Sequence, residues 1–176
     1  MEIRLHIPDP ILRSYFCGRF PAHEDGFRVD TRNLVGLALS TLATRAGGLK
    51  KLDQTEDDPV TVYLSKSKYN DEHRGKILYL SRAAEAKVNA ILRQEFDTTF
   101  TSFCTDAKIC GFKIKDIIEA FIVEYQLDLF EGDIETLKKR YYRYELSTLK
   151  KLREKLRQKA YYAVKRARKI MNSAAL

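Results

Sequence analysis

The residues with the clearest chemistry in this sequence are basic side chains gathered toward its carboxyl end. From Lys138 onward the chain carries fourteen Lys and Arg against two acids, Glu145 and Glu154. The whole chain has a formal net charge of +8, whereas residues 131–176, with fourteen cations and five acids, have a net charge of +9. Residues 1–130 therefore have a net charge of −1. Ammonium and guanidinium groups bind phosphate, so a surplus this local predicts a surface for a polyanion.

Two groups of residues in this stretch are candidates for contacts with nucleic acid. Arginine suits bidentate contact with guanine, and lysine suits phosphate. The first group lies at the start of a helix, beside the inward-facing positions of Ile134, Leu137 and Tyr141. It comprises Thr136, Lys138, Lys139, Arg140, Tyr142 and Arg143. The second group would extend the phosphate footprint, and it comprises Lys150, Lys151, Arg153, Arg157, Lys165, Arg166, Arg168 and Lys169.

A narrow apolar stripe runs through the same stretch. Leu149, Leu152 and Leu156 keep the three-four spacing of a coiled-coil seam, with cations on both sides. These leucines predict a homo-oligomer or another protein partner. The alternative to nucleic-acid binding is therefore a structural or assembly protein, whose long basic helix packs against a partner or neighbouring subunit. We expect no membrane partner, because the stripe is rich in alanine toward its end and lacks Trp and Phe.

Five tyrosines are interleaved with the cations, at Tyr141, Tyr142, Tyr144, Tyr161 and Tyr162. An exposed aromatic ring that stacks on an unpaired base contributes roughly 1–3 kcal/mol. Tyrosine at helical spacing more often fills a core and keeps its hydroxyl at the surface. We therefore expect a structural role for at least three of the five.

No pattern in the chain indicates catalysis. The sequence has no nucleophile elbow, no His-Glu pair at zinc-binding spacing and no dinucleotide fingerprint, so we expect neither an enzyme nor a cofactor. Cys17, Cys104 and Cys110 lack zinc-ligand spacing, which predicts free thiols and no metal site. No apolar run approaches eighteen residues and no signal-peptide pattern begins the chain, so we expect a cytoplasmic protein.

Residues 1–80 predict a small α+β region. Strands are expected over 2–7, 60–64 and 76–80, from alternating or continuous apolar residues. If the last two strands pair, they form a long hairpin with a basic tip. Helices are expected over 11–20, closed by Gly18 or Pro21, and from Asp30 or Thr31 to about Arg45, stopped by Gly47 and Gly48. Residues 23–30 are expected to be a loop, and residues 50–59 an acidic linker.

From residue 81 onward the sequence predicts helices only. Ser81 is the expected N-cap of a helix over 82–105, Gly111 breaks the run, and an apolar stripe predicts a core helix over 113–127. Asp133 is the expected N-cap of the last stretch, to Met171, as one long helix or two. Three successive helices of these sizes have the outline of a helix-turn-helix unit.

The predicted fold class is therefore α+β and mostly helical. A small three-stranded sheet with one or two helices occupies residues 1–80, and a three-helix region with a long basic terminal helix occupies residues 81–176. We expect these parts to form one compact body. The predicted function is non-enzymatic binding of nucleic acid, with duplex DNA favoured over RNA, by a regulator of transcription or an accessory factor.

Overall fold

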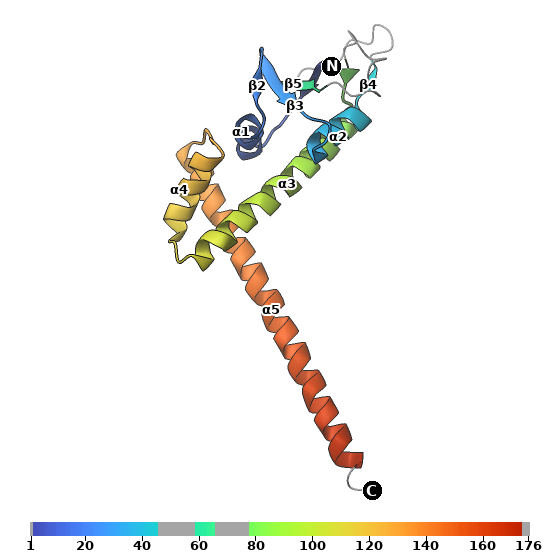
Figure 1. Ribbon diagram of the computed structural model, residues 1–176, viewed down its shortest axis with the longest axis vertical. Coiled ribbons are helices and arrows are strands. Elements are labelled where there is room, and N and C mark those ends of the chain that lie inside the picture. Colours follow the sequence, from blue (N-terminus) through green and yellow to red (C-terminus); the bar gives the residue numbers. More distant parts are fainter. Residues whose placement is uncertain (1, 46–58, 66–77, 174–176) are drawn as a thin grey trace. The chain divides into compact units, whose positions relative to one another are not determined.

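The computed structural model describes residues 2–45, 59–65 and 78–173, and within them the protein is α+β, as the sequence predicts (Figure 1). The elements in chain order are β1 (Glu2–Leu5), α1 (Pro10–Arg19), β2 (Ala22–His23), β3 (Gly26–Val29), α2 (Leu34–Leu42), β4 (Thr44–Arg45), β5 (Val60–Leu64), β6 (Leu78–Tyr79), α3 (Arg82–Ile109), α4 (Ile114–Glu124) and α5 (Glu131–Ser173). The chain divides into two compact units, residues 1–134 and residues 135–176. A domain boundary near residue 80 stays a prediction.

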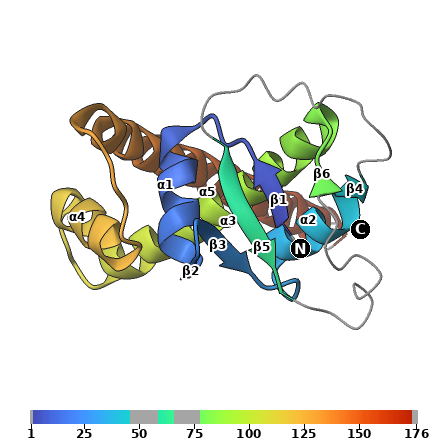
Figure 2. The same cartoon turned by 90° about the horizontal axis from the view of Figure 1, so that it is seen from above.

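The strands of the first unit form one mixed sheet in the order β2-β3-β5-β1-β6-β4. β1 pairs antiparallel with β5, with Ile3 opposite Val62, and parallel with β6. Strand residues alternate between the two faces of a sheet, and Ile3, Leu5 and Val62 are fully buried. Figure 2 shows β3, β5 and β1 side by side with α2 and α3 behind them, so the buried side chains form a core beneath these helices.

One prediction about the strands is wrong, and one pairing that was considered for them does not form. The strands at 60–64 and 76–80 do not form a hairpin, because β1 lies between β5 and β6 in the sheet; the predicted basic tip at 66–77 lies outside the described residues. The predicted loop at 23–30 instead contributes β2 and β3, so the sheet extends beyond the three strands that the sequence predicts. Gly26 permits this pairing, since a Cβ atom there would lie 2.3 Å from the carbonyl oxygen of Thr61.

The first two helices form close to where the sequence predicts them. Asp9 caps α1, because its Oδ1 accepts hydrogen bonds from the amides of Ile11 and Leu12. Of the two predicted stops, Pro21 agrees with the structure, since it directly follows the C-cap Phe20. Gly18 lies inside α1, where a Cβ atom would come within 1.9 Å of the Tyr125 carbonyl oxygen. The glycine therefore allows a close approach of two backbones.

The second helix is shorter than predicted. Asn33, and not Asp30 or Thr31, caps α2 by accepting a hydrogen bond from the Gly36 amide at 2.6 Å. The helix ends at Leu42, because Thr44 and Arg45 pair with β6 as strand β4. Strand pairing, which the local sequence does not reveal, therefore ends the helix. The expected stop at Gly47 and Gly48, like the linker at 50–59 up to residue 58, lies outside the described residues.

Helices α3 and α4 carry an aromatic core, and both confirm the predicted helices. Ser81 caps α3, and α3 ends before Gly111, which has a φ of +85°. Phe121 of α4 lies 6.0 Å from Phe96 and 4.9 Å from Phe100 of α3, between ring centroids, at angles near perpendicular. Edge-to-face rings at this separation attract one another beyond the burial of their surface.

Helix α5 is one continuous helix of 43 residues. It begins at Glu131, two residues before the predicted cap, and Asp133 instead lies in its first turn and accepts a hydrogen bond from the amide of Phe130. Negative charge in a first turn also complements the helix dipole. Leu137 and Tyr141 are buried, as the sequence predicts, and Ile134 is half-buried.

Candidate nucleic-acid interface

The first group of predicted contact residues is divided by burial. Lys139, Tyr142 and Arg143 are exposed, whereas Thr136, Lys138 and Arg140 are half-buried and take part in interactions within the structure. Lys138 pairs with the Glu135 carboxylate, and this ion pair lowers the pKa of Glu135 below its usual value. The exposed cations of this group are therefore Lys139, which also attracts the Glu135 carboxylate, and Arg143.

The second group is exposed wherever its side chains are described. Lys150, Lys151, Arg153, Arg157 and Lys165 are all solvent-exposed on α5. For Arg166, Arg168 and Lys169 the backbone is helical, and the side chains lie outside the described part of the structure. The described cations of this group therefore need no rearrangement to meet a ligand from solvent.

Four of the exposed cations share one side of α5. Arg143, Lys150 and Arg157 are seven residues apart, which is close to two full turns, and Lys139 precedes Arg143 by about one turn. We name these four residues the cationic row. With a rise of 1.5 Å per residue, the row extends for roughly 27 Å along the helix. Within the described part of the structure, none of its four side chains forms a hydrogen bond or an ion pair.

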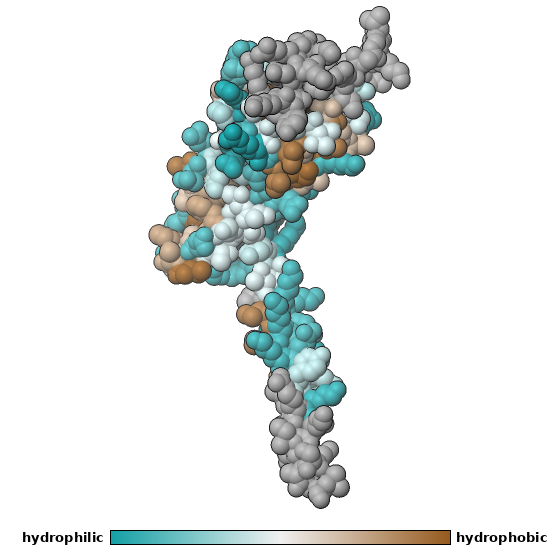
Figure 3. Space-filling view, turned by 45° about the vertical axis from the view of Figure 1, so that its right-hand side comes forward, coloured by the Kyte–Doolittle hydropathy of each residue, from teal (hydrophilic) through white to brown (hydrophobic). Residues whose placement is uncertain are grey.

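An apolar stripe also runs along α5. Tyr142, Leu146, Leu152 and Leu156 are 49%, 67%, 53% and 58% exposed, and they follow one another at spacings of four, six and four residues. Leu149 belongs to the same stripe by position, but its side chain lies outside the described residues. Figure 3 shows a brown apolar patch interrupting the hydrophilic surface of α5. The stripe that the sequence predicts as a protein-binding seam is therefore exposed to solvent in this chain.

Most of the tyrosines on α5 do not fill a core. Tyr141 is buried, but the other four, Tyr142, Tyr144, Tyr161 and Tyr162, are exposed. The expectation that at least three of the five serve packing is therefore wrong. The rings of Tyr161 and Tyr162 lie 5.6 Å apart, nearly perpendicular to one another. Both rings remain more than half exposed, at 62% and 57%.

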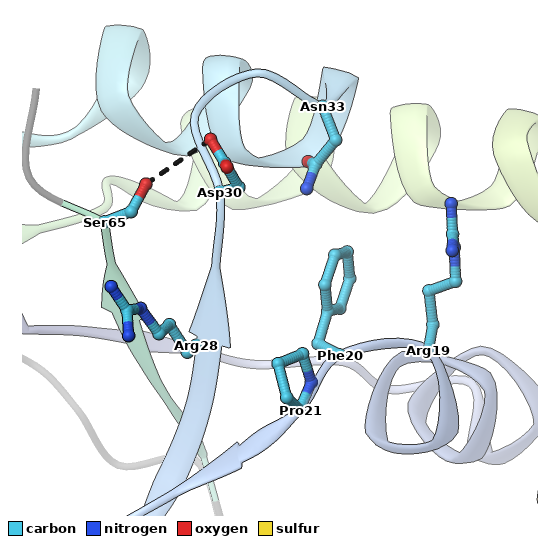
Figure 4. Close-up of a pocket in the computed structure, with 7 residues that line it drawn as sticks. All are labelled: Arg19, Phe20, Pro21, Arg28, Asp30, Asn33 and Ser65. Carbon is cyan, nitrogen blue, oxygen red and sulfur yellow. Dashed lines mark hydrogen bonds between the residues drawn. The ribbon is translucent and has the colours of Figure 1, made fainter.

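A cavity of about 360 Å³ in the first unit is a site that the sequence did not reveal. Its lining comes from the end of α1, from β3 and the turn after it, and from the end of β5: Arg19, Phe20, Pro21, Arg28, Asp30, Asn33 and Ser65 (Figure 4). Arg19 pairs with Glu95 at 3.3 Å, and Asp30 accepts hydrogen bonds from the amide of Arg32 and the Ser65 hydroxyl. The lining thus mixes charges of both signs.

The cavity differs in character from the cationic row. Its size is within the range of small-molecule sites, but Figure 4 shows the Asp30 carboxylate on the same wall as the Asn33 amide. Asn33 also uses its side-chain oxygen to cap α2. A carboxylate in the lining repels a phosphate, so the cavity does not have the uniform positive charge of the cationic row. No signal in the sequence brings these residues together, because the pairing of β3 with β5 and the hydrogen bond from the Arg28 amide to the Pro21 carbonyl join segments far apart or of no evident strand pattern.

Comparison with known proteins finds no matching family model, no similar curated protein and no similar solved structure. Among the described residues, no helix is both long enough and apolar enough to cross a membrane. Nor do three or more His, Cys, Asp or Glu side chains gather as a metal site in that part of the chain. The proposals that follow rest on residues of this chain.

Proposed function

We propose that this protein is a non-enzymatic nucleic-acid-binding protein that binds duplex DNA through α5, as a regulator of transcription or an accessory factor. Residues of the first group, Lys138 to Arg143, would contact the groove or the backbone, and residues from Lys150 to Lys169 would extend the phosphate footprint. The observation that carries the proposal is the cationic row, Lys139, Arg143, Lys150 and Arg157, exposed on one side of a continuous helix. Among the described residues no acid lies within ion-pair distance of these four, although the Glu135 carboxylate attracts Lys139.

The electrostatics of the row favour a polyanion over a single anion. Four cations spread over roughly 27 Å are too far apart to converge on one small ligand. Duplex DNA carries one phosphate charge per about 1.7 Å of its axis, so a straight helix meets several phosphates along this length. The binding free energy then comes mainly from released counterions, which makes binding sensitive to salt.

The helix-turn-helix arrangement belongs to this proposal. α3, α4 and the start of α5 follow in the order of such a unit, although the connection of six residues between α4 and α5 is longer than the usual three or four. In this arrangement Lys139 and Arg143 would face the groove. Arg143 would contact guanine, because its guanidinium can donate two parallel hydrogen bonds to the O6 and N7 atoms of that base.

A titration of the full chain with labelled oligonucleotides at several salt concentrations tests the proposal. If about six phosphates are neutralised, the association constant should fall roughly a thousandfold between 50 and 200 mM salt. Duplex DNA should bind more tightly than single-stranded DNA or duplex RNA of the same length. A flat response to salt, or no binding at 50 mM, would refute the proposal.

The exposed apolar stripe favours a second candidate function, in assembly. Burial of apolar surface stabilises an interface by about 25 cal/mol per Å². The side chains of Leu152 and Leu156 would contribute this free energy when another protein surface covers them. A structural protein would use this stripe, with Leu149, to pack α5 against a partner or a second copy. Substitution of Leu152 and Leu156 by Ser would then change the mass of the assembly in sedimentation equilibrium, while DNA would have no effect on it.

A further inference from the structure

The apolar stripe of α5 has neighbours of one charge only over most of its length. On a helix surface each residue lies beside those three and four positions away. The charged neighbours of Leu146 are Arg143 and Lys150, and the charged neighbour of Leu152 is Lys155. Those of Leu156 are Arg153 and Lys159. All five of these neighbours are exposed cations.

Two acids, Glu145 and Glu154, lie in the part of α5 that carries the stripe. Glu145 lies three positions after Tyr142 and four before Leu149, is half-buried and takes part in interactions within the structure. Glu154 is two positions from both Leu152 and Leu156, which places it away from the stripe. The three described leucines of the stripe, Leu146, Leu152 and Leu156, therefore have only cations as charged neighbours.

We propose that this surface is the docking site of an acidic amphipathic helix from another protein. Such a helix would lay its apolar face on Leu146, Leu152 and Leu156 and place carboxylates against Lys155 and Lys159. Charges that flank an apolar seam decide which helices pair, because opposite charges attract and like charges repel across it. The inference rests on the assembly function proposed above, and it adds the chemistry of the partner.

The cations that border the stripe also argue against two other occupants, a second copy of this chain and an anionic membrane. A second copy would bring Arg153, Lys155 and Lys159 against an equally basic border, and like charges at a seam disfavour pairing. An anionic membrane would satisfy the charges, but the described stripe lacks the Trp and Phe side chains that anchor interfacial helices. Charge complementarity therefore selects an acidic protein partner.

Docking at this site has a consequence for nucleic acid. Lys150 and Arg153, assigned above to the phosphate footprint, also border the stripe. A carboxylate that pairs with either cation leaves it unavailable to phosphate. The acidic partner and DNA would therefore compete for α5, and the partner would act as an inhibitor of DNA binding.

A synthetic peptide of about four heptads, with Leu at the seam positions and Glu at the flanking positions, is the probe. One control peptide replaces each Glu with Lys, and a second keeps Glu but replaces each seam Leu with Ser. Fluorescence anisotropy with the full chain at 150 mM salt should give at least about tenfold tighter binding of the acidic leucine peptide than of either control. Equal binding of the acidic serine peptide would show attraction by charge alone and would overturn the inference.

Two variants of the protein sharpen the measurement. Leu152→Ser with Leu156→Ser should weaken binding of the acidic peptide at least about tenfold. Gln158→Ser, which makes the same new residue on the opposite, exposed face of α5, should leave it unchanged. Circular dichroism checks that both variants keep their helix content. Equal weakening by both variants would contradict docking on the stripe.

Two further measurements distinguish an acidic protein partner from the other possible occupants of the stripe. A doubled mass without peptide would assign the stripe to a second copy, and tighter binding to phosphatidylserine vesicles than to the peptide would assign it to a membrane. Either result overturns the acidic partner. The salt titration with duplex DNA is repeated on the Leu152→Ser and Leu156→Ser variant, which should keep its DNA affinity. If the unsubstituted chain does not bind DNA, the nucleic-acid proposal is refuted and the inference of an acidic partner is not affected.

Discussion

Removing three members of the cationic row should reduce the salt dependence of DNA binding by a calculable amount. The substitutions Arg143→Gln, Lys150→Gln and Arg157→Gln each remove one exposed cation from one side of α5. Each lost phosphate contact lowers the slope of log K against log salt by about 0.9, so three lower it by about 2.7. For a footprint of about six phosphates, the fall in affinity from 50 to 200 mM salt then changes from roughly a thousandfold to about fortyfold.

The matched control removes the same charge from the other unit. Lys87→Gln, Lys113→Gln and Lys115→Gln replace three exposed lysines of α3 and of the α4 start, and they should leave the slope nearly unchanged. Both triple variants should unfold within a few degrees of the unsubstituted protein, because exposed substitutions change stability by about 0.5 kcal/mol or less. Equal loss of slope in both variants would refute a site on α5, since only the net charge of the chain would then matter.

Three further predictions test the first unit and the start of α5. Gly18→Ala should destabilise the protein by about 1–3 kcal/mol or more in denaturant unfolding, because the new Cβ atom would meet a backbone carbonyl at 1.9 Å. The control Gly132→Ala, which has open space around its Cβ position, should be neutral or stabilising by up to about 1 kcal/mol. Cys104 should react with a thiol reagent only on unfolding, because burial raises its pKa to about 12; fast reaction of that thiol in the folded protein would contradict its burial. The hydrogen bond to Asp25 raises the pKa of Tyr63 to about 12. The contribution of this hydrogen bond to the stability of the fold is therefore complete below the ordinary tyrosine pKa and is lost as pH rises through 12. Asp25→Asn should return the ultraviolet titration of Tyr63 toward pH 10.

The helices were predictable because their signals are local. Ser81 caps α3 where the sequence places the cap, since an N-cap needs only the side chain and the amides that follow it. The stripe of Ile117, Ile118 and Phe121 predicted the buried face of α4 for the same reason: three-four spacing is read within one element. The glycine at position 111 marks the end of α3 through its own backbone conformation.

The sheet was not predictable, because its pairing is decided by residues far apart in the chain. Residues 26–29 look like a polar loop by themselves, yet they become β3 because β5 accepts them as a parallel neighbour. Two strands close in sequence, β5 and β6, suggested a hairpin, but β1 lies between them. Alternation shows that a segment can be a strand, but it does not show which strand it pairs with.

The candidate interface was predictable in its charge and less so in its exposure. Counting cations located α5 as the basic element, and the seven-residue repeat of Arg143, Lys150 and Arg157 can be read from the sequence. That Thr136, Lys138 and Arg140 are half-buried depends on their surroundings in the fold. The tyrosines show the same limit, because helical spacing alone does not tell whether a ring faces a core or solvent.

The interior position of β1 in the sheet has a consequence for biosynthesis. Its two neighbours, β5 and β6, lie about sixty and seventy-five residues further along the chain. At roughly 5–20 residues per second, a ribosome needs about 3–12 s to deliver the first of them. During that interval the nascent strand Glu2–Leu5 has two unpaired edges, which makes it a candidate client of ribosome-associated chaperones.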